Sequence, residues 1–242
     1  MPKFFVEPEA VNDGSITLSG SGAEHLKVLR VREGEELTVN AGETDYRCAV
    51  EYAGGGTFRL QILSAGPAQG EPDVSAVVYA ALPKGDKTEV IIQKAVELGA
   101  AAIVPTEMKR CVAKIDPKKE EAKLKRYRAI AESAAKQSGR NRIPEVMPVM
   151  TLKEAIRFAE CLNHVFVPYE HADNMAETKA VIAAVKPGES VGIFIGPEGG
   201  FEESEVAAIT EAGGREISLG KRILRTETAG MTLLSVLMFQ LS

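Results

Sequence analysis

The segment IGPEGGFEESE, residues 195–205, combines glycines with a central glutamate in a way that could form a ligand site. An apolar run ends at Ile195 and leads into the glycine loop, Gly196–Gly200, and the acids that follow suit the positive end of a helix. Glycines allow a backbone to approach a ligand closely, yet neither the P-loop pattern nor the dinucleotide pattern GxGxxG occurs here. Glu198 would repel a phosphate among the loop amides. The loop therefore favours an uncharged or cationic ligand, with a tight turn that binds nothing as the alternative.

A second segment, ISLGKRILRTETAGMTLL at residues 217–234, places a glycine and basic residues before an expected helix. Thr226 or Thr228 could cap that helix by accepting a hydrogen bond from a free backbone N–H. Arg222 and Arg225 could stabilise an anion that develops during a reaction, because a guanidinium is a permanent cation with several donors. The residues alone leave open whether these arginines act in this way or form surface ion pairs.

Positive charge is concentrated in one part of a chain whose formal net charge is −5. Residues 109–142 contain twelve Lys or Arg but only four Asp or Glu. Such asymmetry can produce a local positive potential that attracts nucleic acid. From the sequence alone, a solvent-exposed helix with paired charges explains this concentration of positive charge equally well.

The composition is that of a globular chain, with 45% hydrophobic and 26% charged residues. No apolar run is long enough to span a bilayer, and the N-terminus lacks the pattern of a secretory signal, so we expect no membrane association. The three cysteines are scattered, which argues for a reducing compartment and a cytoplasmic location. The three histidines have no ligand-like spacing, so we expect no metal site.

Two domains, residues 1–70 and 74–242, are predicted from a change in pattern along the chain. The first has short strands separated by turn residues and predicts a small β-barrel. Residues 64–73, SAGPAQGEPD, have the composition of a linker. From Val74 onward strands alternate with helices, including a long basic helix from about Pro117 to Gln137, and this alternation predicts an α/β fold with a mostly parallel sheet.

The last expected helix, residues 226–241, is apolar on nearly all sides. Such a helix must be covered on every face, and a terminal helix rarely achieves this within its own subunit. The pattern therefore predicts a homodimer formed through the C-terminal helix.

Four strings occur in the order ALPKGDKTEVIIQKAVELG, ESAAKQSGRNRIP, IGPEGGFEESE and LGKRILRTETA. Together they resemble the signature segments of the ribosomal small-subunit methyltransferase E family, the 16S rRNA (uracil-N3)-methyltransferases of the SPOUT superfamily. The N-terminal HLKVLRVREGEELTV is similar to that family's PUA-like RNA-binding domain. The likeness covers essentially the whole chain. Lys221 stands where a proline is common and Thr88 where methionine is frequent, and neither departure conflicts with the assignment.

The resemblance implies that residues 74–242 form a SPOUT α/β trefoil-knot domain that binds S-adenosylmethionine, beside a PUA-like β-barrel of residues 1–70. Three loops would hold the cofactor, and the sulfonium cation of this ligand is compatible with nearby acids. The cofactor-binding residues implied by this mapping are Pro168, Tyr169, Glu170, Gly196, Pro197, Glu198, Gly199, Gly200, Leu219, Gly220, Ile223, Leu224, Arg225, Thr226, Thr228 and Ala229.

The reaction implied by the resemblance is methyl transfer to N3 of a uridine in 16S rRNA, either free or within the small ribosomal subunit. N3 carries a proton in neutral uracil, so the reaction needs a general base or a cation that stabilises the ionised base. Arg225 is our first candidate for this cation and Arg140 the second. The chemistry requires no metal.

N3 lies on the Watson–Crick edge, so the target base must be unpaired or extruded from its stack. Candidate phosphate contacts are Arg30, Arg32, Lys84, Arg110, Arg140 and Arg142. Two alternatives remain at this level. One is a SPOUT methyltransferase that acts on another RNA or another atom, and the other is a non-catalytic RNA-binding or ribosome-assembly protein.

Overall fold

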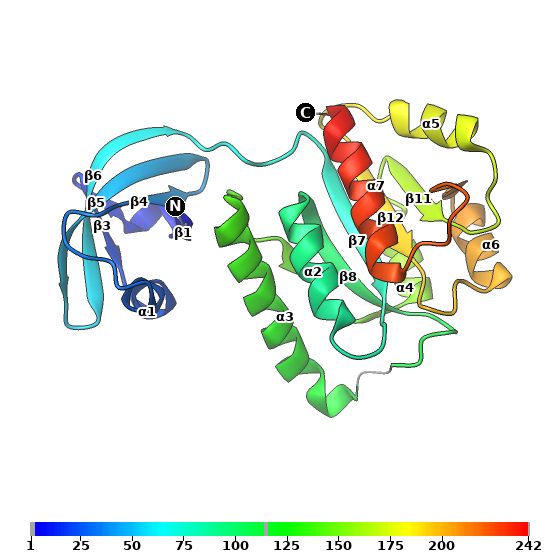
Figure 1. The fold of residues 1–242 in the computed structure, drawn as a ribbon, viewed down its shortest axis with the longest axis horizontal. Helices are drawn as coiled ribbons and strands as arrows, with labels where there is room; N and C mark the ends of the chain where they lie inside the picture. Colours follow the sequence, from blue (N-terminus) through cyan, green and yellow to red (C-terminus); the bar gives the residue numbers. More distant parts are fainter. Residues whose placement is uncertain (1–2, 114–115, 242) are drawn as a thin grey trace. The chain divides into compact units, whose positions relative to one another are not determined.

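The computed structural model of the protein describes residues 3–113 and 116–241, which form two compact units (Figure 1). The first unit comprises the residues up to Glu71 together with Ala135–Arg142. The second comprises Pro72–Ala134 and the residues from Ile143 onward. The segment Ala135–Arg142 was expected in the second domain and instead clusters with the first. The sequence gives no sign of this division, because it falls inside one continuous helix.

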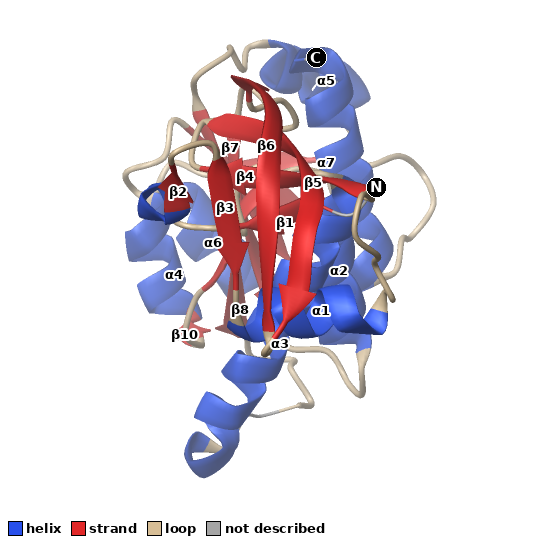
Figure 2. Cartoon of the chain, turned by 90° about the vertical axis from the view of Figure 1, so that its left-hand side faces the viewer, coloured by secondary structure: helices blue, strands red, loops and turns tan. Residues whose placement is uncertain are grey.

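The first unit is a curled sheet with one short α-helix. Its elements are β1 (Lys3–Phe5), a 3-10 turn η1 (Pro8–Ala10), β2 (Val11–Asn12), β3 (Ser15–Leu18), α1 (Gly20–Val28), β4 (Glu36–Ala41), β5 (Thr44–Gly54) and β6 (Thr57–Pro67). The strand order is β1-β4-β5-β6-β3-β2, and among the described pairs only β1–β4 is parallel. Figure 2 shows β3, β6 and β5 side by side. This curled antiparallel sheet agrees with the predicted barrel-like domain.

Alternate residues of these strands face a common apolar core. Ile16 on β3, Val39 on β4 and Leu60 on β6 are fully buried in it. The strand β6 continues to Pro67 because its end pairs with the start of β5. The predicted linker at residues 64–73 is therefore shorter than expected, since its first part belongs to β6.

The second unit is a parallel sheet with helices packed against it. Its strands are β7 (Ser75–Ala81), β8 (Ala100–Glu107), β9 (Glu145–Val146), β10 (Met150–Thr151), β11 (His164–Pro168), β12 (Ser190–Ile195) and β13 (Arg215–Ile217). Its helices are α2 (Lys87–Glu97), α3 (Pro117–Ser138, with its last turn in the first unit), α4 (Leu152–Ala159), α5 (Met175–Ala183), α6 (Glu203–Glu211) and α7 (Thr226–Leu241).

The strand order of the second sheet is β10-β8-β7-β12-β11-β13, with β9 paired to β8, and every described pair is parallel. The predicted α/β class with a mostly parallel sheet is thus confirmed. Because parallel strands run in one direction, the loops that follow their carboxyl ends meet at one edge of the sheet. Open α/β sheets bind their ligands at that edge.

Local sequence signals fix the helices next to this edge. Thr151 and Glu154 form a capping box at the start of α4, and the Asn174 side chain accepts a hydrogen bond from the Glu177 N–H at the start of α5. In the centre of the sheet, Tyr79 stacks on Phe194 with ring centroids 4.3 Å apart. These features hold the strand ends and the loops beside them in place.

The described residues cover the terminal helix α7 on one side only. Leu233, Leu234 and Leu237 are buried, whereas Val236 is partly exposed and Phe239 is 89% exposed. An apolar face of this kind is unusual on a helix that borders water. No helix within residues 3–113 and 116–241 is long and apolar enough to cross a membrane.

Candidate functional site

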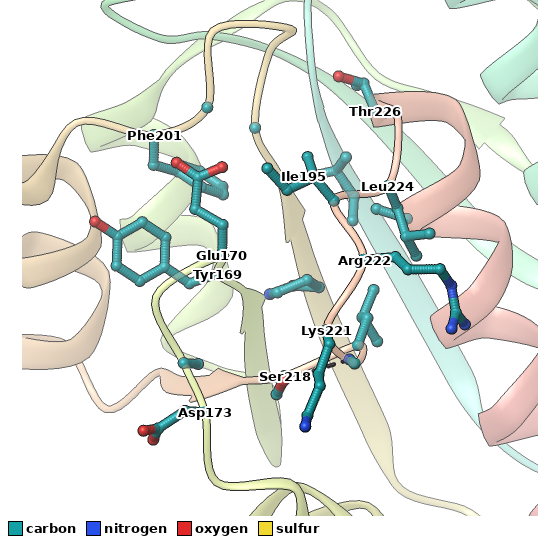
Figure 3. A pocket seen from close by; sticks show the side chains of 18 of the residues that line it. Tyr169, Glu170, Asp173, Ile195, Phe201, Ser218, Lys221, Arg222, Leu224 and Thr226 are labelled. Atoms are coloured by element: carbon teal, nitrogen blue, oxygen red, sulfur yellow. Dashed lines mark hydrogen bonds between the residues drawn. The ribbon is translucent and has the colours of Figure 1, made fainter.

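A cavity of about 550 Å³ lies at the carboxyl edge of the second sheet. Its walls come from residues 168–175 after β11, residues 195–201 after β12, and residues 218–229 between β13 and the first turn of α7. Figure 3 shows side chains of these segments around a common space, with Tyr169 and Glu170 opposite Leu224. The three loops that the sequence predicted to bind a cofactor therefore meet at one place.

Most of the predicted cofactor-binding residues line this cavity. They are Pro168, Tyr169, Glu170, Gly196, Pro197, Gly200, Leu219, Gly220, Ile223, Leu224, Thr226 and Ala229. Four others lie in the same loops but outside the lining: Glu198, Gly199, Arg225 and Thr228. Cofactor binding by the individual residues, these four included, stays a prediction.

The structure adds lining residues that sequence reasoning missed, namely Ala172, Asp173, Met175, Ile195, Phe201, Ser218, Lys221 and Arg222. Ile195 and Phe201 directly flank the glycine loop, so extending that loop by one residue at each end would have found them. Asp173 and Met175 follow the first loop in a stretch without glycines or a motif, and the sequence carried no signal for them.

Gly196 and Gly200 occupy positions where a side chain does not fit. A Cβ at Gly196 would lie 2.9 Å from the ring of Phe201. Gly200 has φ +71°, and a Cβ there would lie 3.3 Å from the carboxylate of Glu170. The loop is closed by a hydrogen bond from the Gly200 N–H to the Pro197 carbonyl at 2.9 Å. The glycine loop therefore forms its part of the cavity wall from closely packed backbone, which suits a ligand recognised through main-chain groups.

The third segment is anchored to its neighbours by hydrogen bonds. The N–H of Ser218 donates to Thr178 Oγ1 at 2.8 Å, and both residues are buried. The N–H of Tyr169 donates to the Ile217 carbonyl at 3.0 Å, which ties the first segment to β13. A preformed cavity of this size, with apolar walls and a few polar groups, is typical of a small-molecule site.

Charged groups of both signs border the cavity. Glu170 and Asp173 belong to one wall, and Lys221 and Arg222 belong to the opposite one. This arrangement suits a ligand that carries both charges, as the sulfonium and amino-acid parts of S-adenosylmethionine do. Within the described ranges, no group of three or more His, Cys, Asp or Glu is placed to hold a metal ion.

Glu198, the central acid of the glycine loop, does not line the cavity and binds a neighbouring loop instead. Its Oε1 accepts hydrogen bonds from the Lys84 backbone N–H at 3.1 Å and from Lys87 Nζ at 3.0 Å. Burial alone would raise the pKa of the Glu198 carboxyl, but the Lys87 side chain and the backbone N–H groups outweigh this and hold the pKa below its usual value. Glu198 therefore attaches the glycine loop to the loop between β7 and α2.

We expect Glu198→Ala to speed hydrogen exchange at the Lys84 amide by about tenfold, because a hydrogen bond to a charged acceptor is lost. Hydrogen-exchange mass spectrometry of the peptide around Lys84 measures this. Glu198→Gln keeps an acceptor oxygen and is the matched control, expected to stay close to wild type. Equal protection in Glu198→Ala and wild type would contradict the attachment.

The other side of the glycine loop is held by the segment after β8. Arg110 Nη1 donates to the Gly199 carbonyl at 2.9 Å, and its Nε lies 3.7 Å from Glu202. The Lys109 N–H donates to Glu205 Oε1 at 2.7 Å, and Glu205 is buried. Basic residues thus border the loop on both sides while remaining exposed to solvent.

Arg140, predicted as a second catalytic candidate and as a phosphate contact, is buried in the first unit. Its side chain is 4% exposed and binds Glu71 through Nε and Nη2, the shorter distance being 2.6 Å. Glu71 also accepts the backbone N–H groups of Asn141 and Arg142. This placement argues against both predicted roles, because the guanidinium is turned inward and its donors already have a carboxylate partner.

We expect Glu71→Gln to lower the free energy of unfolding of the first unit by about 3 kcal/mol at neutral pH, because it removes the negative charge that Glu71 places against the buried Arg140 cation. Burial alone would raise the pKa of Glu71, but Arg140 and the two backbone N–H groups lower it overall. A carboxyl group whose pKa is lower in the folded than in the unfolded state stabilises the fold at pH values above its unfolded-state pKa. This stabilisation is lost as the pH falls through the folded-state pKa. The difference in free energy of unfolding between Glu71→Gln and wild type, measured by urea unfolding, should therefore shrink below about pH 4. A pH-independent difference would contradict this account.

The remaining predicted cations are exposed. Arg225 lies between Leu224 and Thr226, which both line the cavity, and its side chain forms no ion pair with any residue in the described ranges. The exposed candidates for RNA contact are Lys84 and Arg110 beside the glycine loop, and Arg30, Arg32 and Arg142 in the first unit. Their contacts with RNA stay predictions.

Comparison with known proteins agrees with this site. The RNA methyltransferase domain family matches residues 70–238. A ribosomal RNA small subunit methyltransferase E from Bacillus subtilis (strain 168) is 32% identical over 99% of this chain and 97% of its own length. A protein of the same name from Mycobacterium bovis is 38% identical over 91% of this chain and 82% of its own length.

Two solved structures are similar over nearly their whole length. A ribosomal RNA small subunit methyltransferase E from Neisseria gonorrhoeae, bound to S-adenosyl methionine, has 29% identity and a TM-score of 0.83, and the match covers 98% of this chain and 96% of that one. A putative methyltransferase from Legionella pneumophila, in complex with the bound cofactor SAM, has 31% identity and a TM-score of 0.85, covering 97% and 96%.

The parallel sheet, the cavity at its carboxyl edge and the domain match define an RNA methyltransferase of the SPOUT class. Within that class, the chain belongs to the ribosomal RNA small subunit methyltransferase E family, as the relatives from Bacillus subtilis and Mycobacterium bovis show. The family and fold class predicted from the four sequence strings are confirmed.

Proposed function

We propose that this protein uses S-adenosylmethionine to methylate N3 of a specific uridine in 16S rRNA of the small ribosomal subunit. The observation that carries the proposal is the cavity formed by the three loops of residues 168–175, 195–201 and 218–229. Membership of the small subunit methyltransferase E family supports the rRNA substrate, and the two similar structures with bound S-adenosylmethionine support the cofactor.

The chain's own residues account for binding and orientation. When bound, S-adenosylmethionine supplies an activated methyl group on its sulfonium. The tight backbone of Gly196–Gly200 and the apolar side chains of Ile195 and Leu224 would hold the ligand and keep water away from it. Much of the rate would come from holding N3 in line with the methyl group. The N3 proton would pass to solvent water, and Arg225 would stabilise the ionised uracil. Transfer would then form the bond between N3 and the methyl carbon and break the carbon–sulfur bond, which leaves S-adenosylhomocysteine.

The RNA would contact exposed cations in each unit. Lys84 and Arg110 border the glycine loop in the second unit, and Arg30 and Arg32 lie in the first, which we propose as a PUA-like RNA-binding domain. Phosphate contacts of this kind position a substrate without reading its sequence. A cytoplasmic location follows from an rRNA substrate.

A homodimer through α7 is the second part of the proposal. The exposed Phe239 and Val236 form an apolar face that a second copy of the chain would cover. Analytical ultracentrifugation should give a dimer at micromolar concentration, and Phe239→Glu should shift it to monomer. A wild-type monomer at that concentration would reject this part.

The activity is tested by incubating the protein with radiolabelled S-adenosylmethionine and either 16S rRNA lacking the modification or small subunits assembled from it. We expect label in 3-methyluridine, and the comparison of the two substrates shows which one is used. Label in another nucleotide would assign the enzyme to a different target. Calorimetry without heat of S-adenosylmethionine binding would favour a non-catalytic RNA-binding protein instead.

A further inference from the structure

Helix α1 ends in a turn that normally requires glycine, and this chain has an arginine there. The Arg30 N–H donates to the Lys27 carbonyl at 3.0 Å, and the Val31 N–H donates to the Leu26 carbonyl at 3.2 Å. These two bonds define a Schellman motif, in which the residue after the C-cap takes the left-handed conformation. Arg30 occupies that position with φ +55°.

Among the described residues, only Asp13 and Arg30 are non-glycine residues with positive φ. Aspartate tolerates this conformation because its short side chain can bond to the local backbone, and Asp13 lies in a tight hairpin turn before Gly14. An arginine has no such compensation. Strain retained in this way on a surface turn is a reason to look for a ligand.

The core of the first unit fixes the backbone of this turn, whereas the side chains on its outer side are exposed to solvent. Leu26 belongs to the core of the first unit and Val31 packs against that core, so the backbone of Arg30 is fixed. The adjoining Val28 is 79% exposed and Leu29 44% exposed. The Arg30 side chain is exposed and forms no hydrogen bond or ion pair with another part of the chain that the structure describes.

We propose that this surface, Lys27–Arg32, binds an unpaired segment of the rRNA substrate, with Arg30 on a phosphate and Val28 and Leu29 against the faces of bases. The inference rests on the proposed function and adds a defined contact site to it. Three cations, Lys27, Arg30 and Arg32, complement phosphates, and an extruded RNA strand is the partner that presents anionic groups and flat apolar faces together.

The left-handed turn favours a glycine at residue 30, whereas the proposed RNA contact requires the arginine side chain, and the test separates these two effects. Arg30→Gly removes the side chain and also relieves the strained backbone, so its melting temperature should equal or exceed that of wild type. Its affinity for in vitro transcribed 16S rRNA should fall at least about fivefold, and the slope of log affinity against log salt should decrease by about 0.7 for one lost phosphate contact. Arg30→Ala should lose the same affinity but melt at a lower temperature.

Asp13→Gly is the matched control, because it relieves the other strained residue of the same unit without removing a cation. Its melting temperature should also be equal or higher, and its RNA affinity should match wild type. S-adenosylmethionine binding should be unchanged in all three variants. Wild-type RNA affinity and salt slope in Arg30→Gly would overturn the inference, even if the protein methylates rRNA. If wild type neither binds nor methylates the rRNA, the proposed function itself fails.

Discussion

Gly196→Ala is expected to weaken S-adenosylmethionine binding by about tenfold or more while the protein remains folded. The added Cβ would lie 2.9 Å from the Phe201 ring, which is closer than carbon atoms can approach. Phe201 is 4% exposed and is packed in the core with Val206 and Ile209, so its ring has little room to move away. The glycine loop must therefore shift, and the shift displaces the backbone that forms the cavity wall. Isothermal titration calorimetry measures the loss.

Gly199→Ala is the control in the same loop. A Cβ at Gly199 would meet Arg110 at 3.4 Å, which is close to an ordinary contact, and Gly199 does not line the cavity. We expect its affinity to stay within about threefold of wild type. Adding Phe201→Leu to Gly196→Ala should restore part of the binding by making space. Equal losses in the two alanine variants would mean that general loop flexibility, rather than the Phe201 contact, controls the site.

The sequence was most informative where recognition depends on the backbone. A strand, a run of glycines and a helix start can be recognised locally, and Gly196, Gly200 and Gly220, for which cofactor binding is predicted, all line the cavity. The parallel sheet followed from the alternation of strands and helices, and it explains why loops distant in the sequence meet. Helix α7 was predicted at residues 226–241, where the structure has it.

Side-chain direction and long-range partners could not be predicted in this way. Arg140 looked like a candidate cation because its partner, Glu71, lies 69 residues away within the expected linker. Glu198 looked like a ligand contact because its partners, Lys84 and Lys87, are more than a hundred residues away on another loop. Burial of a charge depends on such pairs, which a local pattern does not contain.

Two contacts hold the glycine loop of the site from opposite sides. Glu198 secures one side of the glycine loop and Arg110 secures the other through the Gly199 carbonyl. The acids that would repel RNA phosphates are therefore partly neutralised by neighbouring cations. Lys221, Arg222 and Arg225 carry exposed positive charge next to the cavity that forms no ion pair within the described ranges.

Arg225→Ala is expected to reduce turnover by about a hundredfold or more and to leave the affinity for S-adenosylmethionine within about threefold of wild type. Arg225 is exposed, it adjoins the cavity-lining Leu224 and Thr226, and its side chain lies outside the lining itself. Under the proposed mechanism, a cation there would act on the RNA base that loses its N3 proton rather than on the cofactor. The measurements are single-turnover methylation of rRNA and calorimetry with S-adenosylmethionine.

The pH dependence distinguishes this role from a structural one. Without a cation to stabilise the ionised uracil, the Arg225→Ala rate should depend more steeply on pH and recover partly in alkaline solution, where N3 ionises unaided. Arg225→Lys should keep much of the activity because it keeps the charge. Arg222→Ala removes the same charge three residues away and is the matched control; because Arg222 lines the cavity, the two variants are compared at saturating S-adenosylmethionine. A comparable loss in Arg222→Ala would assign the effect to the total charge of the loop, and near wild-type turnover in Arg225→Ala would exclude Arg225 from catalysis.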